Sequence, residues 1–321
     1  MEQTQERTQK HPLRGSAVLL VTAIIWGVAF VAQSAGMEYI GAFTFNALRH
    51  ILGMLVLLPV IRIRDNRSRR GQKGTDPAAR PEMTQDMPAV PGWPVKGGAV
   101  CGCLLFAASN LQQSGIRYTT VGKAGFITAL YILIVPLLGI FRHRRIGRRL
   151  IISVLLALAG LYLLCMKEQL SLQYGDWLVL LCAFAFSLQI MAVDYYSEIC
   201  DPVKLACIQF GVCALLSGLA MLAAETVSAG QIRQALLPIL YAGILSTGVG
   251  YTFQIIGQRE LDPTIASLIM SLESVISALA GWVLLGQQLS AREITGCAVM
   301  FAAIILAQLP ERTAKGAHSA Q

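Results

Sequence analysis

The sequence predicts an all-α integral membrane protein of ten transmembrane helices, built as two inverted five-helix repeats. Three observations lead to this fold class: the composition, an internal repeat, and the odd number of helices in each copy of the repeat. The chain has 321 residues, of which 55% are hydrophobic and 14% are charged, and its mean hydropathy is +0.59. Long uncharged runs recur along its whole length, so the chain cannot fold in water with an ordinary polar surface.

Ten apolar runs follow one another along the chain. Each has about 17 to 24 residues, enough to cross a hydrocarbon layer of ~30 Å at ~1.5 Å per residue of helix. The first run also has the basic start of a signal peptide, but its length and its repeat partner favour a helix that is retained. The runs lie at 16–35, 41–61, 97–116, 119–141, 150–166, 175–196, 203–224, 234–256, 263–285 and 292–309.

An internal repeat relates the two halves of the chain. Residues 112–139 resemble residues 254–281 at a constant offset of 142, with nine identities in 28 positions. Such self-similarity indicates a duplicated structural unit. Further upstream the offset becomes 160, which fits a longer connection in the first half only. The offsets pair Gln112 with Gln254, Tyr131 with Glu273, Trp26 with Phe186 and Arg49 with Gln209.

The repeat sets the expected organisation of the chain. We expect a first repeat at 16–166 and a second at 167–309, between cytoplasmic tails at 1–15 and 310–321. The stretch 62–96 is rich in proline and charge and has no apolar periodicity. Such a composition is typical of a disordered linker, here a cytoplasmic one.

The basic residues predict the orientation in the membrane. They gather in the connections after the second and the fourth run, whereas the connection after the first run has none. Short basic loops stay in the cytoplasm, so both termini are expected there and the net charge of +8 reports topology. No aromatic residues are interleaved among the arginines, so a nucleic-acid partner is not expected. The basic residues are Arg62, Arg64, Arg67, Arg69, Arg70, Lys73, Arg80 and Lys96 in one connection and Arg142, Arg144, Arg145, Arg148 and Arg149 in the other.

The number of helices in each repeat predicts the architecture. Five is odd, so a second copy that follows directly must enter the membrane in the opposite orientation. Inverted repeats of this kind place a binding site near the middle of the bilayer where the halves meet, and they can rock between outward-open and inward-open states. This is the architecture of a secondary transporter.

Glu273 is the strongest candidate for that site. It lies eleven residues into the ninth run, near the middle of the membrane. An ionised group there costs about 2.5 to 3.5 kcal/mol on insertion scales, so such residues usually face the protein interior or a wet cavity. We expect it to bind substrate or protons, the alternative being a hydrogen bond to a neighbouring helix. The offset of 142 places Tyr131 opposite Glu273 across the same cavity.

Arg49 is the second candidate. Asn46, Arg49, His50 and Gly53 are spaced as one face of a helix, and we expect this face to line the cavity. The alternative is an arginine that reaches toward the headgroups.

Other polar residues in the runs are weaker candidates, because each of them can equally form an interhelical hydrogen bond worth about 0.6 kcal/mol on average. They share faces in three groups, Trp26 with Gln33, Asn110 with Gln113, and Thr247 with Tyr251 and Gln254.

Motifs for other chemistry are missing from the sequence. The chain has no G-x-x-x-x-G-K-[ST], so ATP is not expected to drive it, and it has no H-E-x-x-H or G-x-S-x-G. Most of its eight cysteines lie inside apolar runs without metal-ligand spacing, where thiols act as small hydrophobic groups. We therefore expect no cofactor, no metal and no catalytic residues. A channel is disfavoured because no filter motif is present.

Several motifs resemble one family when they are taken in order. The chain is similar to the EamA-type family of the drug/metabolite transporter superfamily over nearly its whole length outside 62–96 and the tails. The resemblance implies ten helices and export of small metabolites, amino acids or toxic organic compounds across the bacterial inner membrane without ATP. Family members often carry Glu-Pro in the ninth helix and Gly-Glu after it, where this chain has Glu273-Ser274 and Gly286-Gln287, which puts a role for the second acid in doubt. The motifs are 29–33 (AFVAQ), 45–49 (FNALR), 109–113 (SNLQQ), 123–131 (KAGFITALY), 135–139 (VPLLG) and 272–274 (LES).

The sequence thus predicts a secondary transporter rather than an enzyme. We expect it to export a small organic metabolite or drug-like compound across the cell inner membrane by alternating access. The expected partners are that small-molecule substrate, the lipid bilayer and, for coupling, protons; a homodimer is left open. The rival interpretation is a membrane-embedded enzyme that acts on a lipid-linked substrate.

Overall fold

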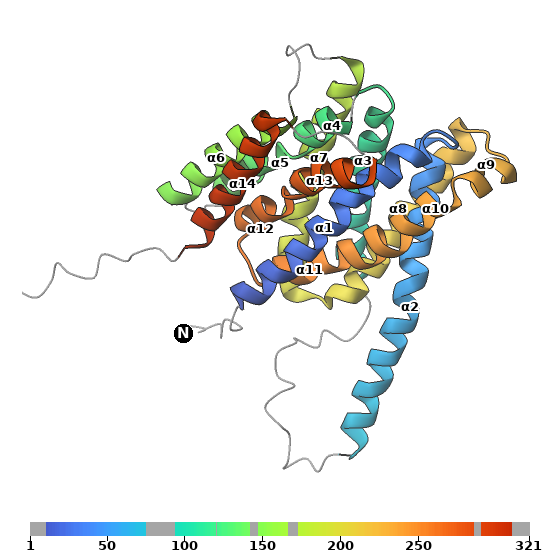
Figure 1. Ribbon diagram of the computed structural model, residues 1–321. Coiled ribbons are helices and arrows are strands. Elements are labelled where there is room, and N and C mark those ends of the chain that lie inside the picture. Colours follow the sequence, from blue (N-terminus) through green and yellow to red (C-terminus); the bar gives the residue numbers. More distant parts are fainter. Residues whose placement is uncertain are drawn as a thin grey trace, which may run out of the picture.

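The protein is helical throughout the part of the chain that its structure, a computed structural model, describes (Figure 1). The described residues are 11–74, 94–119, 121–141, 147–165, 173–285 and 290–309, and no strand occurs in them. The all-α fold class is therefore confirmed.

The helices divide between the two expected repeats. The first half contains α1 (Pro12–Gly36), α2 (Ala42–Gly74), α3 (Val95–Ile116), α4 (Val121–Thr128), α5 (Tyr131–Phe141) and α6 (Arg148–Cys165). The second half contains α7 (Tyr174–Ile199), α8 (Pro202–Ala224), α9 (Ala229–Gln234), α10 (Leu236–Leu240), the π-helix η2 (Tyr241–Tyr251), α11 (Thr252–Arg259), α12 (Pro263–Met270), α13 (Glu273–Leu285) and α14 (Ala291–Gln308).

Eight helical segments within the described ranges are long and apolar enough to cross a membrane. The helices α3 and α6, of 22 and 18 residues, occupy the other two expected runs but are not among the eight. The chain is a multi-pass membrane protein, and the number ten remains a prediction. The eight segments are Pro12–Gly36, Ala42–Arg67, Ala124–Phe141, Tyr174–Ile199, Pro202–Ala224, Leu236–Arg259, Pro263–Ala280 and Ala291–Gln308.

Local capping signals fix where several helices begin. Asp201 accepts hydrogen bonds from the backbone N–H groups of Val203 and Lys204, and Pro202 occupies the first helical position of α8. Asp262 and Pro263 start α12 in the same way. An acidic cap satisfies backbone donors that have no partner inside the helix, and proline fits where no donor is needed.

The helix α2 is longer than the sequence predicted. The apolar run was expected to end at residue 61, with a disordered linker from 62, but α2 continues to Gly74 and projects beyond the rest of the bundle (Figure 1). Two ion pairs of 3.0 Å, Arg64 with Asp201 and Lys204 with Asp65, tie this extension to the start of α8. The linker therefore begins later than expected, and its part at 75–93 lies outside the described residues.

Two of the expected continuous runs are broken helices. The run at 119–141 is interrupted between α4 and α5, and the run at 263–285 is interrupted between α12 and α13. Both interruptions are local turns of the 3₁₀ type: Leu130 N–H donates to Ile127 O at 3.2 Å, and Leu272 N–H donates to Ile269 O at 3.1 Å. These two bonds differ by 142 in both residue numbers, so the breaks are equivalent positions of the repeat.

The packing of the helices has two-fold pseudo-symmetry. Helix α1 packs against η2, α11, α12 and α13, and its equivalent α7 packs against α3, α4 and α5. Likewise, α2 contacts η2 as α8 contacts α3. In two cases a helix packs directly against its own repeat equivalent: α2 packs against α8, and α6 packs against α14. Helices α6 and α14 lie side by side in Figure 1. Each half therefore packs mainly against the other half.

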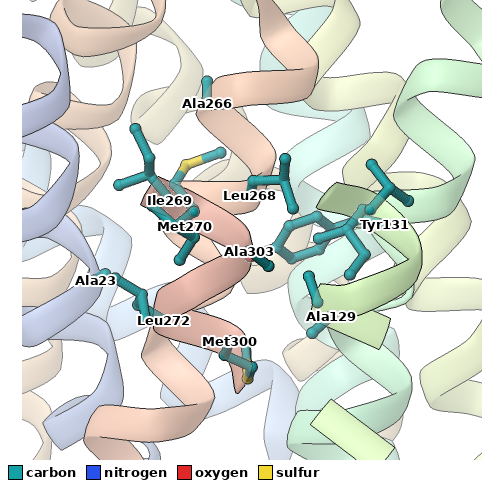
Figure 2. Packing of buried hydrophobic residues seen from close by; sticks show 14 of the residues in the cluster. Ala23, Ala129, Tyr131, Ala266, Leu268, Ile269, Met270, Leu272, Met300 and Ala303 are labelled. Carbon is teal, nitrogen blue, oxygen red and sulfur yellow. The ribbon is translucent and has the colours of Figure 1, made fainter. Parts of the chain in front are cut away.

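The largest apolar cluster joins the two broken helices. It contains buried residues of α1, α5, α6, α12 and α14. Figure 2 shows Ala129 and Tyr131, at the first break, across from Leu268, Met270 and Leu272, at the second. The breaks are thus packed inside the protein rather than exposed to lipid.

Candidate substrate site

A pocket lies between the two halves of the molecule. Its lining comes from four helices at the centre of the contact between the repeats (α1, α2, α3 and α7), from both broken helices, and from η2 and α11. The lining residues are Trp26, Phe30, Gln33, Arg49, Gln112, Thr128, Tyr131, Phe186, Ile190, Ser246, Tyr251, Gln254, Met270 and Glu273.

Most of this lining consists of residues that are equivalent in the repeat. The pairing follows the two offsets in the sequence, 160 upstream and 142 downstream. Because both members of each pair line one pocket, the pocket lies on the pseudo-two-fold axis that relates the halves. The pairs are Trp26 with Phe186, Phe30 with Ile190, Gln112 with Gln254, Thr128 with Met270 and Tyr131 with Glu273.

Tyr131 and Glu273 meet directly in the pocket. The Tyr131 hydroxyl donates a hydrogen bond to Glu273 Oε1 at 3.3 Å. Each is the first residue of the second part of a broken helix, α5 and α13 respectively, and both are buried. The expectation that the repeat brings a phenol and a carboxyl together across one cavity is therefore confirmed.

Arg49 is the only cation among the lining residues, and its side chain is 1% exposed. Its Nη1 donates to Gln33 Oε1 at 3.3 Å, and its guanidinium lies 5.9 Å from the centre of the Phe45 ring. The Nε and Nη2 groups are buried and have no hydrogen-bond partner. The alternative that Arg49 reaches the headgroups is wrong, because the side chain points into the protein.

The π-helix η2 forms another wall of the pocket. The indole N–H of Trp26 donates to the Ser246 carbonyl at 3.1 Å, and the Trp26 and Tyr251 rings are 4.6 Å apart. A side chain at Gly250 would come within 2.6 Å of the Trp26 ring nitrogen, so glycine allows the ring to approach η2. π-Helical turns occur frequently at functional sites.

Two glutamines connect the lining to the surrounding helices. Gln112 Nε2 donates to Thr128 Oγ1 at 3.3 Å, and its repeat partner Gln254 donates to Gln189 Oε1 at 3.2 Å. Gln254 Oε1 is buried without a partner and remains available to a hydrogen-bond donor from a ligand.

Seven of the predicted site residues lie together in the pocket. They come from both repeats and from six elements of the fold. These residues are Trp26, Gln33, Arg49, Tyr131, Tyr251, Gln254 and Glu273.

The other three predicted residues, Asn46, Asn110 and Gln113, do not line the pocket. Asn46 Nδ2 donates to Asn110 Oδ1 at 2.9 Å, and Asn110 Nδ2 donates to Ser217 Oγ at 3.0 Å, which joins α2, α3 and α8. Gln113 donates to the Gln33 carbonyl at 3.2 Å. The rotation of α2 and α3 turns these side chains toward neighbouring helices, so only Arg49 of the predicted α2 face reaches the cavity.

Seven lining residues were missed from the sequence. The repeat offsets contain the signal for two of them, because Phe186 is equivalent to Trp26 and Gln112 is equivalent to Gln254. Four others form two pairs in which neither member was predicted. No feature of the sequence marks Ser246, which depends on the position of the π-helix. The missed residues are Phe30, Gln112, Thr128, Phe186, Ile190, Ser246 and Met270.

Comparison with known proteins agrees with this architecture. An uncharacterized transporter of Archaeoglobus fulgidus is 27% identical over 293 residues, which cover 91% of this chain and 84% of that protein. A crystal structure of a protein with 18% identity superposes with a TM-score of 0.71 over 93% of this chain and 97% of that one, which shows a shared fold. The profile of the EamA-like transporter family matches residues 13–166 and 173–309. With both segments matched, the chain belongs to the EamA-like transporter family.

Proposed function

We propose that this membrane transporter is a secondary exporter that moves a small organic compound out of the cytoplasm by alternating access, with protons as the coupling ion. The observation that carries the proposal is the pocket on the pseudo-two-fold axis, lined by equivalent residues of the two repeats. A site at this position is the one that inverted-repeat transporters use, because neither half alone encloses it.

The packing supports a rocking motion between the halves. Since α1 contacts α13 as α7 contacts α5, exchanging the two sets of contacts interconverts two arrangements of similar energy. One arrangement opens the pocket to one side of the membrane, and the other opens it to the opposite side. The two breaks, at Ala129–Leu130 and at Ser271–Leu272, lie beside the pocket and provide places where such helices can bend.

Glu273 is the proposed proton carrier, because it is the only carboxyl group among the lining residues. The Tyr131 hydroxyl holds its Oε1, so a change in protonation of Glu273 alters a contact between the two repeats. Proton binding and rearrangement of the halves would then be coupled through one hydrogen bond. The proposed location is the cell inner membrane, with both termini in the cytoplasm.

The test is transport into inverted membrane vesicles, in which export is measured as uptake. Candidate metabolites are first ranked by the rise they cause in the melting temperature of the purified protein, since a ligand of the folded state stabilises it. We expect accumulation of a hit compound, chemically unchanged, when the vesicle interior is acidified, and no requirement for ATP. An uptake rate that does not change with the proton gradient would show that protons are not the coupling ion. A chemically altered compound would favour the membrane-embedded enzyme instead.

A further inference from the structure

We propose that the substrate of this pocket is an organic anion, a carboxylate with an apolar or aromatic body, and that Arg49 binds its carboxylate. The inference rests on the proposed function, because it takes the pocket to be the substrate site. It adds the chemical class of the substrate and the residue that selects it.

The first argument is that Arg49 is a buried charge that forms no salt bridge within the described part of the chain. Buried charges in proteins are normally paired, because an isolated ion loses its hydration when it is removed from water. Arg49 is 1% exposed, and Gln33 Oε1 is its neutral hydrogen-bond partner at 3.3 Å. Among the described residues, no carboxylate lies within the 4.0 Å that defines a salt bridge to Arg49. The missing salt-bridge partner is what an anionic ligand supplies.

The second argument is the geometry of the free donors. The unpartnered groups of Arg49 are Nε and Nη2, which lie on one edge of the planar guanidinium with parallel N–H bonds. Two parallel donors match the two oxygens of a carboxylate, and such bidentate pairs are among the strong hydrogen bonds of proteins. The third nitrogen, Nη1, is held by Gln33, which fixes the orientation of the fork.

The third argument is that the charge occurs in one repeat only. The repeat equivalent of Arg49 is Gln209, which is also fully buried but does not line the pocket. The fold therefore accepts a neutral amide at this position, and a charge is not needed to build it. The cation occurs at the position on α2, whose side chain lines the pocket, and not at the equivalent position on α8.

The rest of the lining indicates the body of the ligand. Trp26, Phe30, Phe186 and Tyr251 present aromatic surface to the same pocket as Arg49. A few polar groups that orient the ligand, set among apolar and aromatic walls, are the usual composition of a small-molecule site. A carboxylate with an aromatic or aliphatic body fits both parts.

The experiment compares carboxylates with their neutral amides on the full-length protein in detergent. The probes are benzoate, 3-phenylpropionate and indole-3-acetate, each with its primary amide, and affinity is taken from the concentration dependence of the melting temperature. We expect at least one carboxylate to bind about tenfold more tightly than its amide, the range expected for hydrogen bonds to a charged group. Equal affinity within all three pairs overturns the proposal.

Variants then assign the preference to Arg49. Arg49→Gln introduces the residue that the second repeat carries at the equivalent position, and we expect it to bind the carboxylate and its amide equally. The matched control is Gln209→Leu, at the equivalent buried position outside the pocket, which should keep the full preference. If Arg49→Gln does not fold, Arg49→Lys decides, because lysine keeps the charge and loses the fork: a reduced preference supports the proposal and an unchanged one overturns it.

These measurements separate the anion site from the transporter. Binding is measured without transport, so carboxylate preference that depends on Arg49 stands even if vesicles take up no compound, in which case the proposed function alone fails. Conversely, gradient-driven transport of neutral or cationic compounds, with no carboxylate preference, overturns the anion site and leaves the transporter in place.

Discussion

At the scale of residues, the contact between Tyr131 and Glu273 joins equivalent positions of the two repeats. Glu273 is 5% exposed and Tyr131 is 4% exposed, and their hydrogen bond is 3.3 Å long. This side-chain contact therefore links the two halves at the pocket, as the hydrogen bond of Trp26 to Ser246 also does. This makes the pair sensitive both to the protonation of Glu273 and to the relative position of the halves.

We expect Glu273→Gln to uncouple or abolish transport without reducing insertion into the membrane. Glutamine keeps the size of the side chain and can still accept a hydrogen bond from Tyr131, but it cannot carry a proton. The measurement is uptake of a hit compound into inverted vesicles across a range of pH and proton gradients. An unchanged rate and pH profile in the variant would reduce Glu273 to a structural hydrogen-bonding group.

For Tyr131→Phe we expect weaker substrate binding and intact insertion. The substitution removes the hydroxyl that contacts Glu273 and keeps the aromatic ring, and interhelical hydrogen bonds in membranes are worth about 0.6 kcal/mol on average. The expected result is a rise of about two- to fivefold in the KM for transport, with the corresponding fall in affinity. Leu155→Ala serves as the control, because Leu155 is 57% exposed on the outer surface of α6 and should be nearly silent. Equal effects of the two substitutions would contradict a role for the hydroxyl.

At the scale of elements, the contact between α6 and α14 depends on a pair of glycines. A side chain at Gly296 would come within 2.6 Å of the Gly160 carbonyl and of the Leu164 backbone nitrogen. Backbone atoms cannot move away as a flexible side chain can, so the two helices would have to separate. Small residues allow such close packing of transmembrane helices, which gains dispersion energy and excludes lipid.

We therefore predict that Gly296→Ala destabilises the protein by about 1–3 kcal/mol, the usual cost of overpacking. The measurement is thermal unfolding in detergent, followed by the loss of helical signal. Gly218→Ala is the matched control within α8, because nothing lies within 4 Å of a side chain added there. A lower melting temperature in both variants, by the same amount, would show that the effect does not come from the α6–α14 contact, because alanine itself favours the helix more than glycine does.

At the scale of the whole molecule, the relative orientation of the two repeats in the membrane depends on how many helices of each repeat cross it. Eight described segments are long and apolar enough to cross, and α3 and α6 occupy places equivalent to segments among these eight. Helix α3 packs against α7 as η2 and α11 pack against α1, and α6 packs against α14. If α3 and α6 also cross, each half has five crossings and the repeats are inverted.

The corresponding prediction is a reporter map of the connections. A reporter that works only in the cytoplasm should be active when fused at 75–90, at 142–146 or after Gln321. A reporter that works only in the periplasm should be active when fused at 119–120 or at 166–172. The physical reason is the excess of arginine and lysine in the first two of these connections and the odd number of crossings per repeat. Cytoplasmic activity on both sides of α3 or of α6 would show that the helix does not cross, and periplasmic activity after Gln321 would contradict the inverted repeats.

The sequence by itself determined the all-α membrane fold, the duplication and the meeting of Tyr131 with Glu273. These features depend on local or periodic properties: long apolar runs must be helical in a bilayer, and a constant offset carries equivalent residues to equivalent places. The same offset also contained the pairs of Trp26 with Phe186 and of Gln112 with Gln254 that line the pocket.

The tertiary structure alone decided which polar side chains face the pocket. Asn46 and Arg49 share a face of one helix, yet Asn46 bonds to Asn110 and Arg49 faces the cavity. The breaks in the two helices, the π-helix around Ser246 and the extension of α2 to Gly74 were likewise not visible in the sequence. The physical reason is that helix rotation, helix breaks and hydrogen-bond partners depend on contacts with the other repeat, and these contacts form only when the two halves pack together.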